Sequence, residues 1–133
     1  MQLLLSLMTR KDERIRVGTA YDGYLLDDFG RLLAFPGGEL QAIGEQLGIN
    51  VAALQEVADV PSRRVWQSVE MLEGVVTKLV RAMDGVTIEV EPFFLGPGEA
   101  VEALKVGFPA LLAALKIARE KGATEVALDG FLG

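Results

Sequence analysis

Four carboxylates are the residues of this chain whose types and spacing most suggest chemistry. Val86 to Glu91 alternates apolar and polar residues, which predicts a half-buried strand with Glu89 and Glu91 on one face. If the last strand pairs beside it, Glu125 and Asp129 join that face. Clustered carboxylates bind Mg²⁺ or Mn²⁺ or support acid–base chemistry, so these four are the candidate metal ligands. The alternative is a solvent-facing sheet surface whose other face carries the core.

Other groups that support catalysis are scarce. The 133 residues include no histidine and no cysteine, which removes the commonest general base, the usual zinc and copper ligands, thiol nucleophiles and disulfides. The only serines are Ser6, Ser62 and Ser68, and none stands in a Gly-x-Ser-x-Gly or Ser-x-x-Lys motif. Phosphate-loop and dinucleotide fingerprints are absent as well. We therefore expect binding rather than catalysis, assign no catalytic residue and predict no cofactor.

One aromatic and polar cluster stands on a predicted loop. Tyr21, Asp22 and Tyr24 are candidate contacts for a small ligand, because tyrosine combines an apolar ring with a polar tip. A turn flanked by half-buried tyrosines is the alternative and requires no ligand.

Two joints that precede predicted helices resemble each other, residues 35–39 (FPGGE) and residues 94–99 (FLGPGE). Backbone N–H groups at a helix N-terminus bind anions, but Glu39 and Glu99 occupy the first turns, where a carboxylate satisfies the helix dipole itself. We interpret both joints as helix-capping turns with shared turn chemistry rather than as a repeat.

Residues 40–57 match the packing pattern of a helix-turn-helix. Gly48 takes the place of the turn glycine, with the small residue Gly44 four positions earlier. The segment from residue 39 to residue 60 holds acidic residues but no lysine or arginine, so it repels phosphate. The whole chain has 13 Lys and Arg against 19 Asp and Glu, a net charge of −6. DNA binding is therefore kept only as an alternative, and nucleic acid is not the expected partner.

Hydrophobic periodicity predicts an α+β fold, with residues 1–133 forming a single two-layer domain. Two N-terminal hairpins are expected, residues 2–8 with 14–20 and residues 24–26 with 31–35. About four helices are expected, over residues 40–47, after Asn50, over 61–83 and over 99–121, with Pro109 kinking or breaking the last. A strand over residues 124–128 completes a C-terminal strand-helix-strand unit.

The two long predicted helices carry narrow apolar seams whose members are spaced three and four residues apart. The seams are Val65, Val69, Leu72, Val76, Leu79 and Met83 in one helix, and Val101, Leu104, Phe108, Leu111, Leu115 and Ala118 in the other. They pack against each other and the sheet, or leave one seam for a second copy. Apolar residues also gather near predicted turns, and the candidate interface residues are Trp66, Phe93, Phe94 and Phe131, with a core position as the alternative for Trp66.

The N-terminus indicates no export signal. Residues 1–8 are apolar but too short to span a membrane, and no basic residue precedes them. We therefore expect a cytoplasmic protein without a membrane partner. The leading hypothesis is a small non-enzymatic interaction or regulatory domain that acts as a homodimer. The alternatives are an enzyme that uses carboxylates and a divalent metal, and a helix-turn-helix DNA-binding protein.

Overall fold

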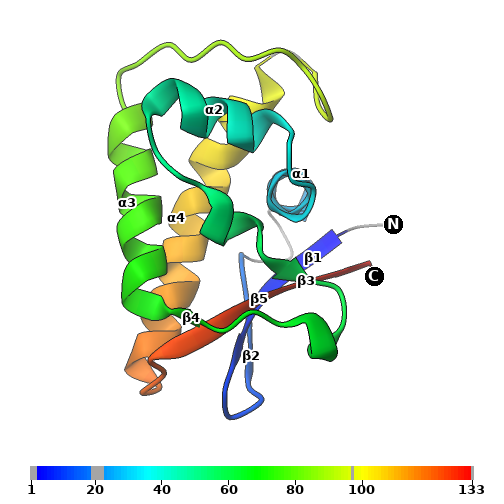
Figure 1. Cartoon of the computed structure of the whole chain (residues 1–133), viewed down its shortest axis with the longest axis vertical. Coiled ribbons are helices and arrows are strands. Elements are labelled where there is room, and N and C mark those ends of the chain that lie inside the picture. Colours follow the sequence, from blue (N-terminus) through cyan, green and yellow to red (C-terminus); the bar gives the residue numbers. More distant parts are fainter. Residues whose placement is uncertain (1–2, 19–22, 97, 133) are drawn as a thin grey trace.

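A mixed β-sheet forms one layer of the computed structural model, which describes residues 3–18, 23–96 and 98–132 (Figure 1). Its strands within those ranges are β1 (Leu3–Thr9), β2 (Arg14–Arg16), β3 (Val57–Ala58), β4 (Gln67–Ser68) and β5 (Glu125–Leu132). β1 lies between β2 and β5 and is antiparallel to both. The second edge of β5 pairs with β3 in parallel and with β4 in antiparallel orientation. The α+β prediction is confirmed.

The first predicted hairpin is confirmed, since β1 and β2 pair with Leu7 opposite Ile15. The second predicted hairpin is wrong, because residues 23–34 form a helix, α1 (Gly23–Ala34). Leu26, Phe29 and Leu33 are buried at intervals of three and four residues, which is the helical period. Burial of this stripe outweighs the turn signal that lies between them.

The helix-turn-helix is not formed. Its first helix is present as α2 (Glu39–Leu47), which ends at Gly48 in the left-handed region with φ 71°. The second is only a four-residue 3₁₀ helix, η2 (Ala52–Gln55). Its N-cap is Val51 rather than the expected Asn50, although the Asn50 side chain accepts a hydrogen bond from the N–H of Ala52 at 2.9 Å. The chain then becomes extended and enters β3, so no recognition helix follows α2.

The third helix begins later than predicted. Residues 61–63 form a short 3₁₀ helix, η3 (Pro61–Arg63), and the chain then runs extended through β4. Only at Ser68 does α3 (Val69–Met83) start, where the serine side chain accepts a hydrogen bond from the N–H of Met71 at 3.2 Å. Val65 therefore lies outside the seam and is exposed.

The predicted strand over residues 86–91 is also wrong, since this segment has no regular secondary structure. A strand needs an unpaired edge, and both edges of β5 are already occupied, by β1 and by β3 with β4. The segment instead bridges α3 and α4 (Glu99–Glu120), and the latter continues unbroken through Pro109. The C-terminal unit is thus helix and strand without a preceding strand.

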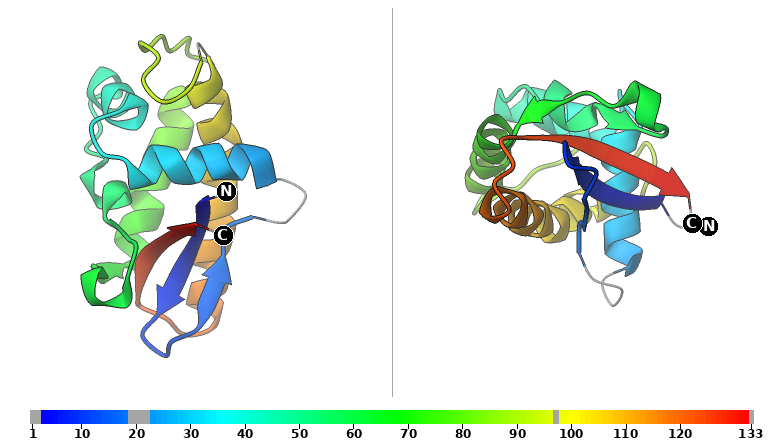
Figure 2. Two further views of the ribbon diagram at one scale, coloured as in Figure 1. Left: turned by 90° about the vertical axis from the view of Figure 1, so that its right-hand side faces the viewer. Right: turned by 90° about the horizontal axis from the view of Figure 1, so that it is seen from below.

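The predicted seams are buried within this chain. Five seam residues of α3 and five of α4 join the sheet residues Leu7 and Leu128 in one core. The ring of Phe29 on α1 meets that of Phe108 on α4 edge to face, with centroids 5.4 Å apart. Helices cover one face of the sheet, and the segment from β3 to β4 runs along the edge of β5 (Figure 2). Neither seam is left open for a second copy.

Candidate interaction surface

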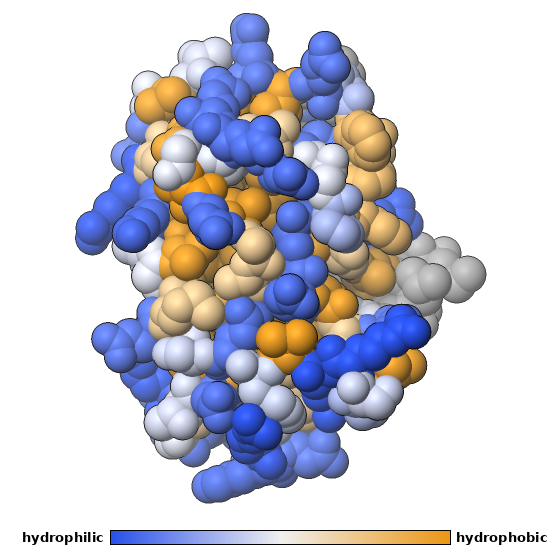
Figure 3. Space-filling model, viewed as in Figure 1, coloured by the Kyte–Doolittle hydropathy of each residue, from blue (hydrophilic) through white to orange (hydrophobic). Residues whose placement is uncertain are grey.

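Three exposed phenylalanines, Phe35, Phe93 and Phe94, form an apolar cluster that we call the phenylalanine patch. Their exposed fractions are 49%, 70% and 39%. The ring of Phe94 lies 5.4 Å from that of Phe35 and 4.9 Å from that of Phe93, between centroids. Apolar side chains gather at the upper right of Figure 3, over the segment that precedes α4. Aromatic side chains grouped in this way on a surface mark binding sites.

The patch is held in place by a buried carboxylate. Glu39 is 1% exposed, and its carboxylate accepts hydrogen bonds from the backbone N–H groups of Phe94 and Leu95 at 2.9 to 3.0 Å. The ring of Phe94 also covers Gly38, where an added Cβ would lie 2.3 Å from the ring. The two joints of similar sequence therefore contact each other, and Glu39 binds the backbone of the second joint.

A hollow of about 360 Å³ adjoins the patch and is lined by Leu3, Arg31, Phe35 and Phe94. Its floor is fixed by Asp27, which accepts a hydrogen bond from the N–H of Leu3 and forms an ion pair with Arg31 at 3.3 Å. The neighbouring Asp28 is buried, and this desolvation, aided by the negative charge of Asp27, raises the pKa of Asp28 above its ordinary value.

Sequence reasoning identified only part of this surface. Phe93 and Phe94 were among the candidate interface residues, but Trp66 lies elsewhere, half-buried with the guanidinium of Arg10 4.3 Å from its ring centroid. The side chain of Phe131 lies outside the described residues. Phe35 was missed, although it takes the same position in the first joint as Phe94 does in the second.

The four candidate metal ligands do not converge. Glu125 accepts hydrogen bonds from Arg10 at 3.2 and 3.3 Å, while Asp129 is buried. Glu89 and Glu91 lie on the irregular segment before α4, away from β5. In the part of the chain that the structure describes, no group of three or more acidic residues is placed to hold a metal ion.

Asp129 instead binds arginine. The guanidinium of Arg64 donates to both carboxylate oxygens at 2.9 to 3.1 Å, and Arg14 lies 3.9 Å away. The hydrogen bond to Asp129 raises the pKa of Arg64 above its ordinary value. This ion pair fastens the segment between η3 and β4 to the outer face of β5.

The predicted ligand contacts Tyr21 and Asp22 lie outside the described residues, as does the side chain of Tyr24. Within the described ranges, no helix is both long and apolar enough to cross a membrane. Comparison with protein-family models, with curated proteins and with solved structures finds no match.

Proposed function

We propose that this protein is a small cytoplasmic, non-enzymatic interaction domain that forms a homodimer through the phenylalanine patch. The observation that carries the proposal is the exposure of three touching aromatic rings on a backbone that the buried Glu39 carboxylate holds in position. Aromatic side chains that are already ordered lose little conformational entropy on binding, so they act as anchors at interfaces.

A second copy of the chain is the partner that the surface fits best. A two-fold interface must present a projection and a complementary recess on the same surface. Here Phe93 projects, with 70% of its surface exposed, beside the hollow lined by Leu3, Arg31, Phe35 and Phe94. In the proposed dimer each Phe93 ring enters the hollow of the other copy, where the Arg31 guanidinium is placed for a cation–π contact.

Sedimentation velocity or light scattering at micromolar concentrations tests this proposal. We expect the wild-type chain to be dimeric and Phe93→Ser to be monomeric, with an unchanged circular dichroism spectrum because Phe93 lies outside the core. Ile117→Ser on α4 is the matched control, since this side chain is also exposed, at 43%, and should leave the dimer intact. A monomeric wild type, or equal effects of the two substitutions, would refute the proposal.

A further inference from the structure

The turn of the β1–β2 hairpin and the C-terminal end of α4 lie at the end of the molecule opposite to the segment that precedes α4 (Figure 1). The hairpin turn carries Arg10, Lys11, Asp12 and Glu13, and Lys121 and Glu125 flank the turn that joins α4 to β5.

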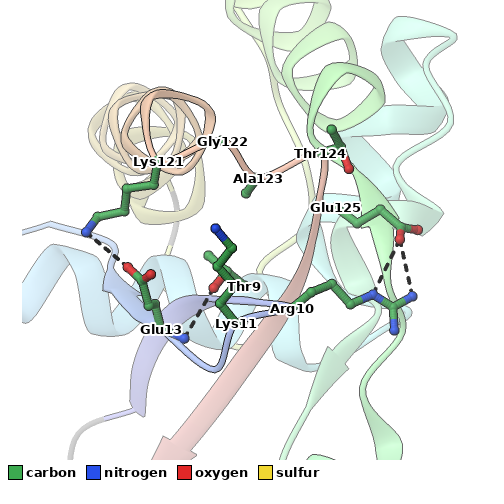
Figure 4. A pocket seen from close by; sticks show the side chains of 9 residues that line it. All are labelled: Thr9, Arg10, Lys11, Glu13, Lys121, Gly122, Ala123, Thr124 and Glu125. Atoms are coloured by element: carbon green, nitrogen blue, oxygen red, sulfur yellow. Dashed lines mark hydrogen bonds and ion pairs between the residues drawn. The ribbon is translucent and has the colours of Figure 1, made fainter.

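A cavity of about 110 Å³ opens between the turn of the β1–β2 hairpin and the turn that joins α4 to β5 (Figure 4). An ion pair closes each side. Lys121 contacts Glu13 at 3.1 Å on one side, and Arg10 contacts Glu125 at 3.2 Å on the other. We call this space the hairpin cavity.

Lys11 supplies the unmatched charge of the hairpin cavity. Its side chain extends from the hairpin turn toward Ala123, between the two ion pairs (Figure 4). Among the described residues, its ammonium has neither an ion-pair partner nor a hydrogen-bond acceptor. The other two cations of the lining are each matched by a carboxylate, so the cavity has a net charge of one positive unit directed inward.

From this geometry we propose that the hairpin cavity binds the phosphate group of a small molecule, with Lys11 as the principal contact and Lys121 and Arg10 completing the site. The volume of about 110 Å³ accommodates a group of phosphate size but not a whole nucleotide, so the remainder of the ligand lies outside. Each ammonium or guanidinium donates charge-assisted hydrogen bonds to phosphate oxygens. Nucleic acid is disfavoured because its binding requires many cations along a stripe, and this chain is acidic overall.

Titration with inorganic phosphate tests the site. The NMR chemical shifts of the backbone amides of Lys11, Gly122 and Thr124 report whether phosphate binds. Chloride at equal ionic strength is the reference, because screening alone would affect both titrations equally. We expect phosphate to shift these amides saturably. Lys11→Ala, at an exposed turn position, should weaken binding by about tenfold or more. Lys78→Ala, at an exposed position on α3, should leave the affinity unchanged.

A second variant separates binding from a structural role of the lysine. Glu13→Gln removes one carboxylate of the lining and frees Lys121, so phosphate affinity should rise by about twofold to tenfold. The exposed Lys121–Glu13 pair adds little stability, so this variant folds. Three results would overturn the proposal: equal shifts with chloride, equal affinity of Lys11→Ala and the wild type, or binding of a short single-stranded oligonucleotide without binding of inorganic phosphate.

Discussion

Replacement of Glu39 by glutamine tests how the phenylalanine patch is held. The carboxylate accepts hydrogen bonds from the N–H groups of Phe94 and Leu95 at 2.9 to 3.0 Å, and the side chain is almost wholly buried. Glutamine has the same shape, but one of its two terminal groups is an NH₂ donor. The glutamine oxygen in the place of Oε2 stays an acceptor for both N–H groups but is neutral, while the NH₂ group in the place of Oε1 faces the N–H of Phe94.

The expected loss follows from these two contacts. A hydrogen bond to a charged group contributes about 1.5–3 kcal/mol and one between neutral groups about 0.5–1.5 kcal/mol. The substitution makes the shared acceptor of both N–H groups neutral and replaces the second acceptor of Phe94 by a donor, so the free energy of unfolding should fall by about 2–4 kcal/mol. A change of this size is large against a total stability of about 5–15 kcal/mol.

Urea denaturation measures this loss, and hydrogen exchange locates it. The amides of Phe94 and Leu95 should exchange faster in Glu39→Gln, because their charged acceptor becomes neutral and Phe94 loses its second acceptor. The matched control is Glu45→Gln on the same helix, whose exposed side chain accepts a hydrogen bond from Gln41, and it should change stability by less than about 0.5 kcal/mol. If Glu39→Gln matches this control and both amides stay protected, then the carboxylate does not hold the patch.

Three further predictions concern the core and the buried charges. Gly107→Ala should destabilise the protein by about 1–3 kcal/mol, since its Cβ would lie 2.1 Å from the ring of Phe29 on α1. Gly74→Ala, in open space on α3, should instead stabilise it by about 0.5–1 kcal/mol. Thermal or urea unfolding measures both changes. Burial raises the pKa of Asp28 in the folded state above its value in the unfolded state, so the protein loses stability as the pH rises from the unfolded pKa through the folded one. Asp28→Asn should therefore be more stable than the wild type at pH 7. Denaturation at acidic pH should show this advantage vanishing below about pH 4. Arg64→Ala should cost about 3–5 kcal/mol by urea denaturation because it leaves a buried carboxylate without its main partner, whereas the neighbouring Arg63→Ala breaks only an exposed pair and should cost less than about 1 kcal/mol.

The elements that local pattern decides were predictable from the sequence, and those that depend on distant partners were not. The seams of α3 and α4 are buried as predicted, because a three-four apolar period forms a helix whose stripe must be covered. Residues 86–91 alternate as a strand does, but both edges of β5, the expected partner, are occupied, and an isolated strand is not stable in water. In α1 the residues Asp27 to Gly30 carry a turn signal, and the helix forms because Phe29 packs against Gly107 and Phe108.

The candidate surfaces divide in the same way. Phe93 and Phe94 were identifiable as apolar residues in a turn-rich segment, because the local sequence alone indicates that such a segment lies at the surface. The role of Glu39 was not, because the N–H groups that donate to its carboxylate lie 55 and 56 residues away in the chain and the first turn of a helix is an ordinary place for glutamate. The hairpin cavity likewise joins residues 9–13 to residues 121–125.

Salt should affect the two proposed surfaces in opposite directions. Two copies with a net charge of −6 each repel at low ionic strength, while the phenylalanine patch that joins them is apolar, so screening should strengthen the dimer. Phosphate binding at the hairpin cavity rests on cations and should weaken under the same screening. Raising sodium chloride from about 0.01 M to about 1 M shortens the screening length from about 30 Å to about 3 Å, which spans both regimes. A dimer that dissociates as salt rises would contradict an apolar interface between like-charged copies, and a phosphate affinity that does not respond to salt would contradict a cationic site at the hairpin cavity.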